Sequence, residues 1–192
     1  MILLAAGCSV LEPKDGPGKV IAPESIAEAT PRVEPITRAG NYTPYTVFGE
    51  TYHLLPSAEG YQSRGIASWY GRKFHGRLTS NGERYDMYGM TAAHKTLPIP
   101  SYVRVTNTDN GNSAIVRIND RGPFHPDREI DLSWAAAIKL GFSDQGTAPV
   151  EIIAIDPVAW LAERQQQPSI AIAPIQPPPR LLSGDYLQVG SF

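Results

Sequence analysis

Cysteine and surplus charge are both scarce in this sequence. The 192 residues include one cysteine, Cys8, so no disulfide can form within the chain and a disulfide-stapled fold is excluded. The formal net charge is only −2, whereas proteins that bind nucleic acid normally present a strongly basic surface. We therefore expect no nucleic-acid partner. The length suits one ordinary domain with tails, or two small domains.

Long hydrophobic runs are also lacking. The apolar run from Ile2 to Ala6 is far shorter than the about 20 residues that a membrane-spanning helix needs. It overlaps LAAGC (residues 4–8), which resembles the end of a bacterial lipobox, where a signal peptide is cleaved before a cysteine that then carries lipid. We therefore expect lipidation of Cys8, in a protein whose start lies further upstream. The alternative is an apolar tip with an incidental cysteine.

Proline is abundant but unevenly distributed. Most prolines fall before residue 64 or after residue 156, which predicts a central globular unit between proline-rich segments. Residues 1–63 lack sustained periodicity, so we expect a lipoprotein N-terminus and a flexible stalk. Residues 64–156 are the expected domain, and residues 157–182 are interpreted as a Pro-rich linker.

The central segment has the pattern of a small β protein. Four stretches have the alternation or composition of strands: 65–71, 101–107, 113–119 and 150–155. Asn110-Gly111, between the middle two, is a strong hairpin signal. LSWAAAIKLGF predicts one helix, with Ser133 as its N-cap and Gly141 just after its end. Several short strands with one small helix favour a compact β-barrel.

Five motifs follow one another in this segment: ASWYGRKFHGRLTSNGERYDM, MTAAHKTLP, VRVTN, VRINDRGPF and EIDLSWAAAIKLG. They resemble the rare lipoprotein A family nearly motif for motif, over about residues 64–156. The resemblance implies a mainly β fold, a six-stranded double-psi β-barrel with one or two short helices and disordered tails. Expansins, barwin and some endoglucanases share this barrel. Two features depart from the family: Trp134 replaces an expected basic residue, and HPDRE (125–129) replaces a shorter or less acidic turn.

The resemblance implies an endolytic lytic transglycosylase of peptidoglycan, acting mainly on glycan strands stripped of peptides. Cleaving the MurNAc–GlcNAc β-1,4 bond requires a proton donor for the leaving oxygen and support for an oxocarbenium-like transition state. The sugar's own 6-hydroxyl attacks C1 and gives a 1,6-anhydro-MurNAc end. One carboxyl group can protonate the leaving oxygen and then, as carboxylate, receive the hydroxyl proton. No cofactor is expected.

Asp120 is the best candidate for this carboxyl group. It lies in VRINDRGPF (116–124), where a predicted strand meets a Gly-Pro turn, so the barrel rather than a mobile loop would set its position. An aspartate here could instead accept backbone N–H bonds from the turn at Gly122. The resemblance assigns the catalytic role to Asp120.

Glu83 is the second candidate carboxylate. It follows a turn at Asn81-Gly82, and from the residues alone it would be an exposed loop glutamate. The resemblance makes it a second catalytic or charge-stabilising group. A neighbouring carboxylate would raise the pKa of one of the two acids, which keeps that acid protonated near neutral pH.

Other candidates come from the same motifs. His94 corresponds to a site histidine of the family, or is a rim histidine satisfied by backbone groups. Lys95 and Arg121 could orient the carboxylates or contact sugar, but ordinary ion pairs would also explain them. Of three aromatic residues that could stack on sugar (Trp69, Tyr70 and Tyr85), Tyr85 is expected to line the groove and Trp69 to be in the core. The histidine spacing predicts no metal site.

The last ten residues, SGDYLQVGSF (183–192), resemble the opening strand of a sporulation-related repeat domain, a module that binds glycan at division septa. A chance apolar tail is the alternative. We expect a lipoprotein on the periplasmic face of the outer membrane, at the septum, with peptidoglycan strands and divisome proteins as partners in daughter-cell separation. Two other functions stay open: a non-catalytic expansin-like glycan-binding or scaffold protein, and a hydrolase that leaves reducing ends.

Overall fold

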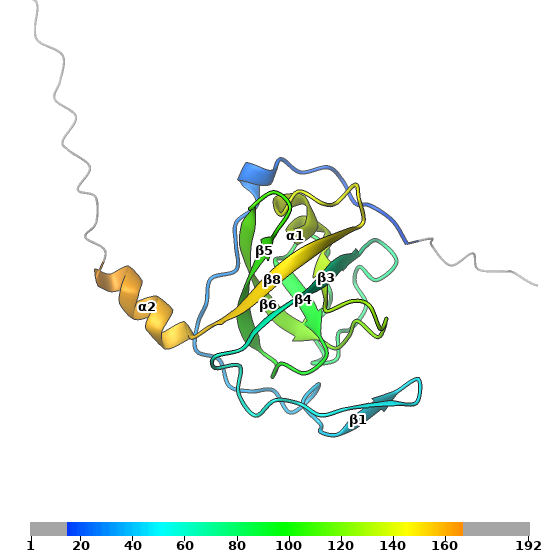
Figure 1. The fold of residues 1–192 in the computed structure, drawn as a ribbon, viewed down its shortest axis with the longest axis vertical. Helices are drawn as coiled ribbons and strands as arrows, with labels where there is room; N and C mark the ends of the chain where they lie inside the picture. The colour runs from blue at the N-terminus through cyan, green and yellow to red at the C-terminus, as the bar shows by residue number, and fades with distance from the viewer. Residues whose placement is uncertain (1–14, 167–192) are drawn as a thin grey trace, which may run out of the picture.

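A closed barrel of six strands forms the centre of the computed structural model, which describes residues 15–166 (Figure 1). The strands are β3 (Gln62–Tyr70), β4 (Thr91–His94), β5 (Ser101–Asn107), β6 (Ser113–Asp120), β7 (Ile130–Ser133) and β8 (Thr147–Ile155). Their order around the barrel is β3-β7-β4-β6-β5-β8. The mainly β barrel expected from the sequence is therefore confirmed. Cys8 and residues 183–192 lie outside the described residues.

Two of the six strand pairings are parallel, β3 with β7 and β4 with β6, and the other four are antiparallel. The hairpin predicted at Asn110-Gly111 joins β5 to β6, and Gly111 has the positive φ, +76°, that such a turn requires. Parallel pairing needs long crossovers, so strands distant in sequence become neighbours. This topology brings the separate motifs together.

The interior is filled by alternate residues of the strands, as a period of two requires. Fully buried examples are Ala67, Ala92, Val103, Val116, Ile118, Ile130, Leu132 and Ile152. The predicted helix is α1 (Trp134–Lys139), and the Ser133 side chain caps it by accepting a hydrogen bond from the Ala136 N–H at 3.2 Å. Gly141 follows with φ +73°, as predicted for the position after a helix end.

Trp134 is a core residue in this structure. Its ring packs edge-on against Trp69, with the ring centroids 4.6 Å apart, and its indole N–H donates to the Lys19 carbonyl at 3.0 Å. A basic side chain would leave this buried site without its apolar contact. The departure at Trp134 thus has a packing role, and it attaches the N-terminal segment to the barrel.

Residues 15–61 lie against the barrel, which differs from the flexible stalk expected for residues 1–63. Ile26 packs into the core, and backbone N–H groups of Ala29 and Thr37 donate to the carbonyls of Ile115 and Ile99 at 3.1 and 3.0 Å. An extended chain that bonds to a neighbouring strand needs no periodicity of its own. Its composition therefore resembles that of a linker.

Three short elements lie outside the barrel (Figure 1). A 3-10 turn, η1 (Pro23–Ser25), lies in the N-terminal segment, and the strands β1 (Tyr45–Val47) and β2 (Glu50–Tyr52) form a hairpin beside the barrel. The helix α2 (Pro157–Gln166) occupies the start of the expected linker. Among residues 15–166, no helix has the length and apolar character to cross a bilayer.

Candidate active site

A β-bulge determines where Asp120 points. In the parallel pair of β4 and β6, Thr91 lies opposite Arg117 and Ala92 opposite Ile118, but Ala93 lies opposite Asp120 because the register shifts by one residue. Regular pairing would place Asn119 opposite Ala93 and turn Asp120 toward the interior, since side chains alternate between faces. The bulge keeps Asp120 on the outer face of the barrel.

A second carboxylate lies in the same row. Ala93 of β4 pairs with Asp120 on one side and with Asp131 of β7 on the other, and Asp131 pairs in turn with Ser68 of β3. Adjacent strands lie about 4.8 Å apart, so the two aspartate backbones are about 10 Å apart across Ala93. We call Ser68, Asp131, Ala93 and Asp120 the carboxylate row.

Asp120 is held by backbone groups at one oxygen. Its Oδ1 accepts hydrogen bonds from the N–H groups of Ser80 and Arg121, both at 2.8 Å. Within residues 15–166 no hydrogen bond reaches Oδ2. The expected structural role, acceptance of turn N–H groups, is thus present but involves Ser80 and Arg121 rather than Gly122, and it leaves one oxygen for a ligand.

Asp131 has a different environment. The Ser68 hydroxyl donates to its Oδ1 at 2.6 Å, and an Arg128 guanidinium nitrogen lies 3.3 Å from the same atom. Burial raises the pKa of the Asp131 carboxyl above its usual value, although the Ser68 hydrogen bond and the Arg128 and Lys95 charges act in the opposite direction. Asp131 therefore retains a proton to higher pH than an ordinary aspartate.

The Tyr70 hydroxyl belongs to the same region. It is buried and forms no hydrogen bond of normal geometry within residues 15–166. Burial raises its pKa well above the usual value, and the nearby Tyr85, Asp120 and Asp131 groups raise it further. The Thr91 hydroxyl, also without a bond of normal geometry, is close enough to lower this pKa slightly. The raised pKa keeps the Tyr70 hydroxyl protonated near the two aspartates.

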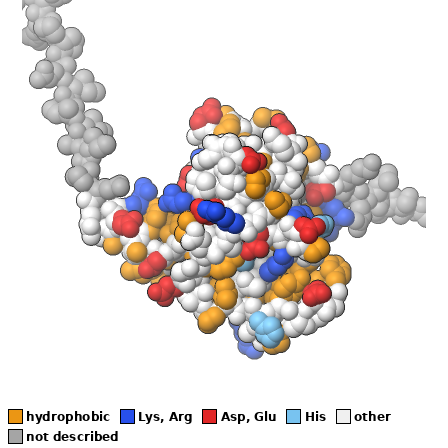
Figure 2. Space-filling model, viewed as in Figure 1, with side chains coloured by type: hydrophobic (Ala, Val, Ile, Leu, Met, Phe, Trp, Pro, Cys, Tyr) orange, Lys and Arg blue, Asp and Glu red, His pale blue; other side chains and the backbone are white. Residues whose placement is uncertain are grey.

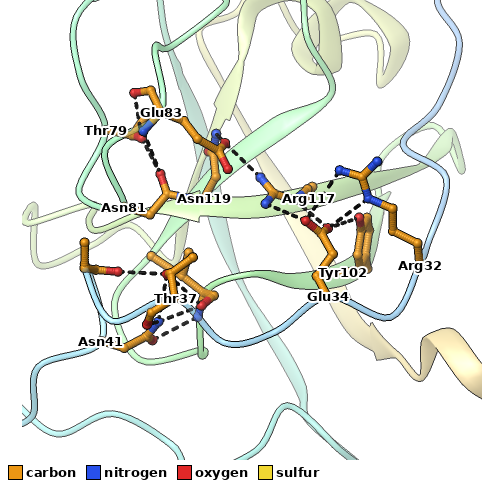
Figure 3. A network of polar contacts seen from close by, with 12 residues as sticks. Arg32, Glu34, Thr37, Asn41, Thr79, Asn81, Glu83, Tyr102, Arg117 and Asn119 are labelled. Atoms are coloured by element: carbon orange, nitrogen blue, oxygen red, sulfur yellow. Dashed lines mark hydrogen bonds and ion pairs between the residues drawn. The ribbon is translucent and has the colours of Figure 1, made fainter.

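The Glu83 carboxylate pairs with one cation and one side-chain amide, in the network of Figure 3. Its Oε2 accepts from Arg117 at 2.8 Å and from the Asn119 side chain at 3.1 Å. Burial acts to raise the pKa of Glu83, but these hydrogen bonds and the Arg117 charge outweigh it, so the pKa is lowered. The lowered pKa favours the ionised form of Glu83, which can stabilise positive charge.

Arg117 joins two parts of the chain. Its Nε and Nη2 donate to both oxygens of Glu34 at 2.9 and 3.0 Å, while its Nη1 donates to Glu83 (Figure 3). Tyr102 also donates to Glu34. Burial opposes ionisation of Glu34, yet these bonds lower its pKa to about 2. The network thereby fixes the N-terminal segment and the Glu83 loop to β6.

His94 is buried, and each of its ring nitrogens has a partner. Its Nδ1 accepts from the backbone N–H groups of Thr96 and Leu97 at 3.2 and 3.1 Å. Its Nε2 is 2.9 Å from the Tyr61 hydroxyl, which donates to Glu129 at 2.8 Å. Burial lowers the pKa of His94, so the neutral ring with a proton on Nε2 fits these partners. Backbone satisfaction was one of its two predicted roles.

The two predicted cations serve as anchors. The Arg121 guanidinium donates to the carbonyls of Gly40, His94 and Leu97 at 2.7, 3.0 and 2.6 Å and to the Asn41 side chain at 2.9 Å. Lys95 donates to the Arg128 carbonyl. Among the described residues neither forms an ion pair with a candidate carboxylate, although the Lys95 charge acts on Asp131.

Tyr85 does not line a groove, so the expected sugar-stacking role is wrong for this residue. Its side chain is 2% exposed, its ring stacks on Tyr70 with centroids 4.1 Å apart, and its hydroxyl donates to the Tyr70 carbonyl at 2.5 Å. Tyr85 was expected to be exposed because it lies near Glu83 in the sequence. The bridge between Leu78 and Arg84 instead turns the side chain of Tyr85 inward.

Sequence reasoning missed Asp131. The signal was present in EIDLS, because apolar residues at 130 and 132 predict an interior face and leave residue 131 on the opposite face.

An open pocket of about 340 Å³ adjoins Ser68 and Arg128, the two partners of Asp131. A hollow of about 610 Å³ lies beside Ile115, roughly 16 Å along β6 from Asp120, and includes none of the predicted residues. Within residues 15–166 no cluster of three His, Cys, Asp or Glu could hold a metal ion.

Comparisons with known proteins agree with the barrel and its motifs. Residues 62–152 match the family model described as lytic transglycolase. The chain is 62% identical over 130 residues to the endolytic peptidoglycan transglycosylase RlpA of Pseudomonas aeruginosa, covering 68% of this chain and 38% of that protein. It is 52% identical over 164 residues to RlpA of Vibrio cholerae, covering 81% and 62%. The chain thus spans less than two thirds of these curated relatives.

Solved structures with similar folds are more distant. One is the Streptomyces papain inhibitor, with 23% identity, a TM-score of 0.42 and coverage of 50% of this chain and 96% of that one. Another is an expansin of Clavibacter michiganensis in complex with cellohexaose, with 16% identity, a TM-score of 0.40 and coverage of 50% and 51%.

Proposed function

Because this chain belongs to the rare lipoprotein A family, whose domain is a double-psi β-barrel, we propose that it is an endolytic lytic transglycosylase of peptidoglycan glycan strands. The observation that best supports this function is the carboxylate row. A bulge keeps Asp120 on the outer face, two backbone N–H groups hold its Oδ1, and Oδ2 has no hydrogen bond from residues 15–166.

In the proposed reaction the Asp120 carboxyl donates its proton to O4 of the leaving GlcNAc while the MurNAc C1–O4 bond breaks. The 6-hydroxyl oxygen of the same MurNAc bonds to C1, and its proton passes to the Asp120 carboxylate. One bond breaks, one forms, and the acid is regenerated without water. The product carries a 1,6-anhydro-MurNAc end.

Neighbouring residues have supporting roles in this proposal. Glu83 is a positioning residue, because its carboxylate holds the side chain of Asn119, directly before Asp120. The raised pKa of Asp131 makes it a second group able to hold a proton, and the Tyr70 hydroxyl is a donor close to both aspartates. His94, Lys95 and Arg121 support the site through the backbone segments that they bind.

The test is digestion of purified, peptide-free glycan strands by the full chain, with mass spectrometry of the ends. Asp120→Asn keeps an acceptor for Ser80 and Arg121 but cannot transfer the proton, so anhydro ends should fall at least 100-fold. Asp127→Asn, at a carboxylate 86% exposed in the turn that follows, is the matched control and should keep full activity.

Three outcomes would contradict the proposal. Anhydro ends that persist in Asp120→Asn would remove Asp120 from the chemistry. Reducing ends in place of anhydro ends would make the protein a hydrolase. Strand binding without any turnover by the unaltered chain would favour the expansin-like binding protein instead.

The setting is proposed on the same basis. A lipid on Cys8 would tether the protein to the periplasmic face of the outer membrane, near septal strands cleaved in daughter-cell separation, with divisome proteins as partners. A single acyl chain binds membranes weakly, so stable anchoring requires more than one. Loss of the protein from the outer-membrane fraction in Cys8→Ser, after expression behind a lipoprotein signal sequence, would support the anchor; unchanged fractionation would exclude it.

A further inference from the structure

Four aromatic rings lie together beside the turn that follows Asp120. Tyr45 and Tyr52 stack across the β1–β2 hairpin with centroids 5.2 Å apart, and Phe124 meets their rings at 6.3 and 5.7 Å. Phe48, at the hairpin tip, lies edge-on to Phe124 at 6.5 Å. We call these four residues the aromatic platform. Figure 2 shows hydrophobic side chains gathered on the surface over this hairpin.

The platform is fixed to the part of the barrel that holds Asp120. Phe124 is four residues after Asp120 in the same turn. Arg121, the residue next to Asp120, binds Gly40 and Asn41 just before the hairpin, and the Tyr45 hydroxyl donates to the Lys95 carbonyl at 2.8 Å. The rings are therefore held in place before any ligand arrives, which reduces the entropy lost on binding.

Phe48 occupies a position that folding alone does not favour. It is the one non-glycine residue with positive φ among residues 15–166, at +50°, and its side chain is 90% exposed. Phe48 and Gly49, at φ +86°, form a two-residue hairpin turn that strongly prefers Asn-Gly. A phenylalanine here has a strained backbone and almost no burial in return. Such a residue points to a contact with something outside the chain.

The platform also provides what the predicted stacking residues do not. Tyr70 and Tyr85 are buried, so their faces cannot meet a ligand. A pyranose ring in β-linkage has an apolar face of axial C–H groups that packs on an aromatic ring, while its equatorial hydroxyls stay in water. Several adjacent rings suit a strand of successive sugars better than a single sugar.

We propose that the aromatic platform is a binding site for the glycan strand, which stacks sugar rings that lie beyond the cleaved bond on the Phe124 side of Asp120. The site deepens the proposed function and rests on it for the identity of the ligand. The charge pattern favours glycan over membrane, because residues 45–52 contain one charged residue, Glu50, and no lysine or arginine to attract anionic lipid.

The test measures binding of long, peptide-free glycan strands to the full chain in an Asp120→Asn background, so that the strands are not cut. Adding Phe48→Asn should weaken binding about tenfold. The same change should leave the unfolding temperature equal or higher, because asparagine tolerates positive φ at this turn. Val158→Asn removes an apolar side chain that is 61% exposed on α2 and should leave binding unchanged.

A second measurement separates this proposal from the proposed function. With Asp120 intact, Phe48→Asn should raise the strand concentration needed for half-maximal rate while the rate at saturation stays the same, because no platform residue takes part in proton transfer. If the unaltered chain forms no anhydro ends but Phe48→Asn still weakens strand binding, the proposed function fails and the platform stands.

Other outcomes would overturn the platform. Unchanged strand affinity in Phe48→Asn would remove it as a glycan site. Together with reduced binding to vesicles of phosphatidylethanolamine and phosphatidylglycerol, that result would assign the rings to a membrane surface. Together with a shift from dimer to monomer in size-exclusion chromatography, it would assign them to an interface between two copies of the chain.

Discussion

The carboxylates beside β6 lie in two contrasting environments. Glu34 and Glu83 converge on Arg117, which pairs with both, and their pKa values are lowered. In the carboxylate row, Asp120 uses only backbone donors at one oxygen, and burial raises the pKa of Asp131. In the first group, Arg117 neutralises both carboxylates, and the ion pairs attach the N-terminal segment and the Glu83 loop to β6. The second has an oxygen that no hydrogen bond reaches from residues 15–166 and a carboxyl group with a raised pKa, and both suit acid–base chemistry.

The comparison teaches that a nearby carboxylate is not by itself a catalytic partner. Glu83 is the acid that the motif suggests as the partner of Asp120, but its carboxylate is paired with the Arg117 guanidinium. Asp131 is 11 residues from Asp120 in the sequence and two strands away in the sheet, and it shares the register position of Ala93. Strand register, rather than proximity within a motif, determines which acids lie on the same face of the barrel.

The largest effect on stability should come from removing Arg117, the cation that Glu34 and Glu83 share. Arg117→Met should lower the free energy of unfolding by about 3 kcal/mol, because Glu83 would lose the cation it pairs with and Glu34 would keep only its longer ion pair with Arg32. Urea denaturation measures this. Arg104→Met, at an exposed arginine of β5, is the matched control and should change stability by less than about 0.5 kcal/mol. Equal effects of the two substitutions would contradict the attachment role.

A smaller effect with a defined pH dependence is expected at Glu34. Its pKa falls from 4.5 to about 2 on folding, so its ionised form stabilises the fold above pH 4.5, and this contribution is lost as pH falls toward 2. Glu34→Gln should therefore destabilise the protein by about 2 kcal/mol at pH 7. The difference from the unaltered chain should shrink between pH 5 and pH 3. A difference independent of pH would mean that charge is not involved.

The smallest effect, of opposite sign, is expected at Asp131. Its pKa is raised on folding, so its contribution to stability is fully present below its unfolded pKa and is lost as pH rises through the folded value. Asp131→Asn should be slightly more stable than the unaltered chain at pH 7, by less than about 1 kcal/mol. The two should be equally stable near pH 3. A loss of stability in Asp131→Asn at pH 7 would mean that ionised Asp131 stabilises the fold, as Glu34 and Glu83 do.

Local patterns predicted α1 and four of the six barrel strands, because alternation and caps are properties of neighbouring residues. The strands β4 and β7 have four residues each, too few to show a clear alternation, and were not predicted. The N-terminal segment could not be predicted in this way. Its order comes from single contacts with distant parts of the barrel, such as Ala29 with Ile115 and Glu34 with Arg117. A segment that folds onto an existing surface has the composition of a linker but an ordered backbone.

The candidate site was predicted in part. Asp120 and Glu83 do belong to one connected region, through Asn119 and Ser80. Two backbone pairings that the sequence does not reveal decide which side chains face outward. One is the bulge at Asn119, and the other is the Leu78–Arg84 bridge that turns Tyr85 inward. The aromatic platform combines a hairpin and a turn about 75 residues apart, so no local window contains it.

The bulge in β6 also has a consequence for comparing homologues. If β6 kept all its residues but paired regularly with β4, the letters DRGPF would survive in an alignment, but the aspartate would turn into the barrel interior. A homologue can thus preserve the signature and lose the chemistry. The register of this aspartate against Ala93 of β4 is therefore a better criterion than the motif for recognising homologues that keep the carboxylate on the outer face.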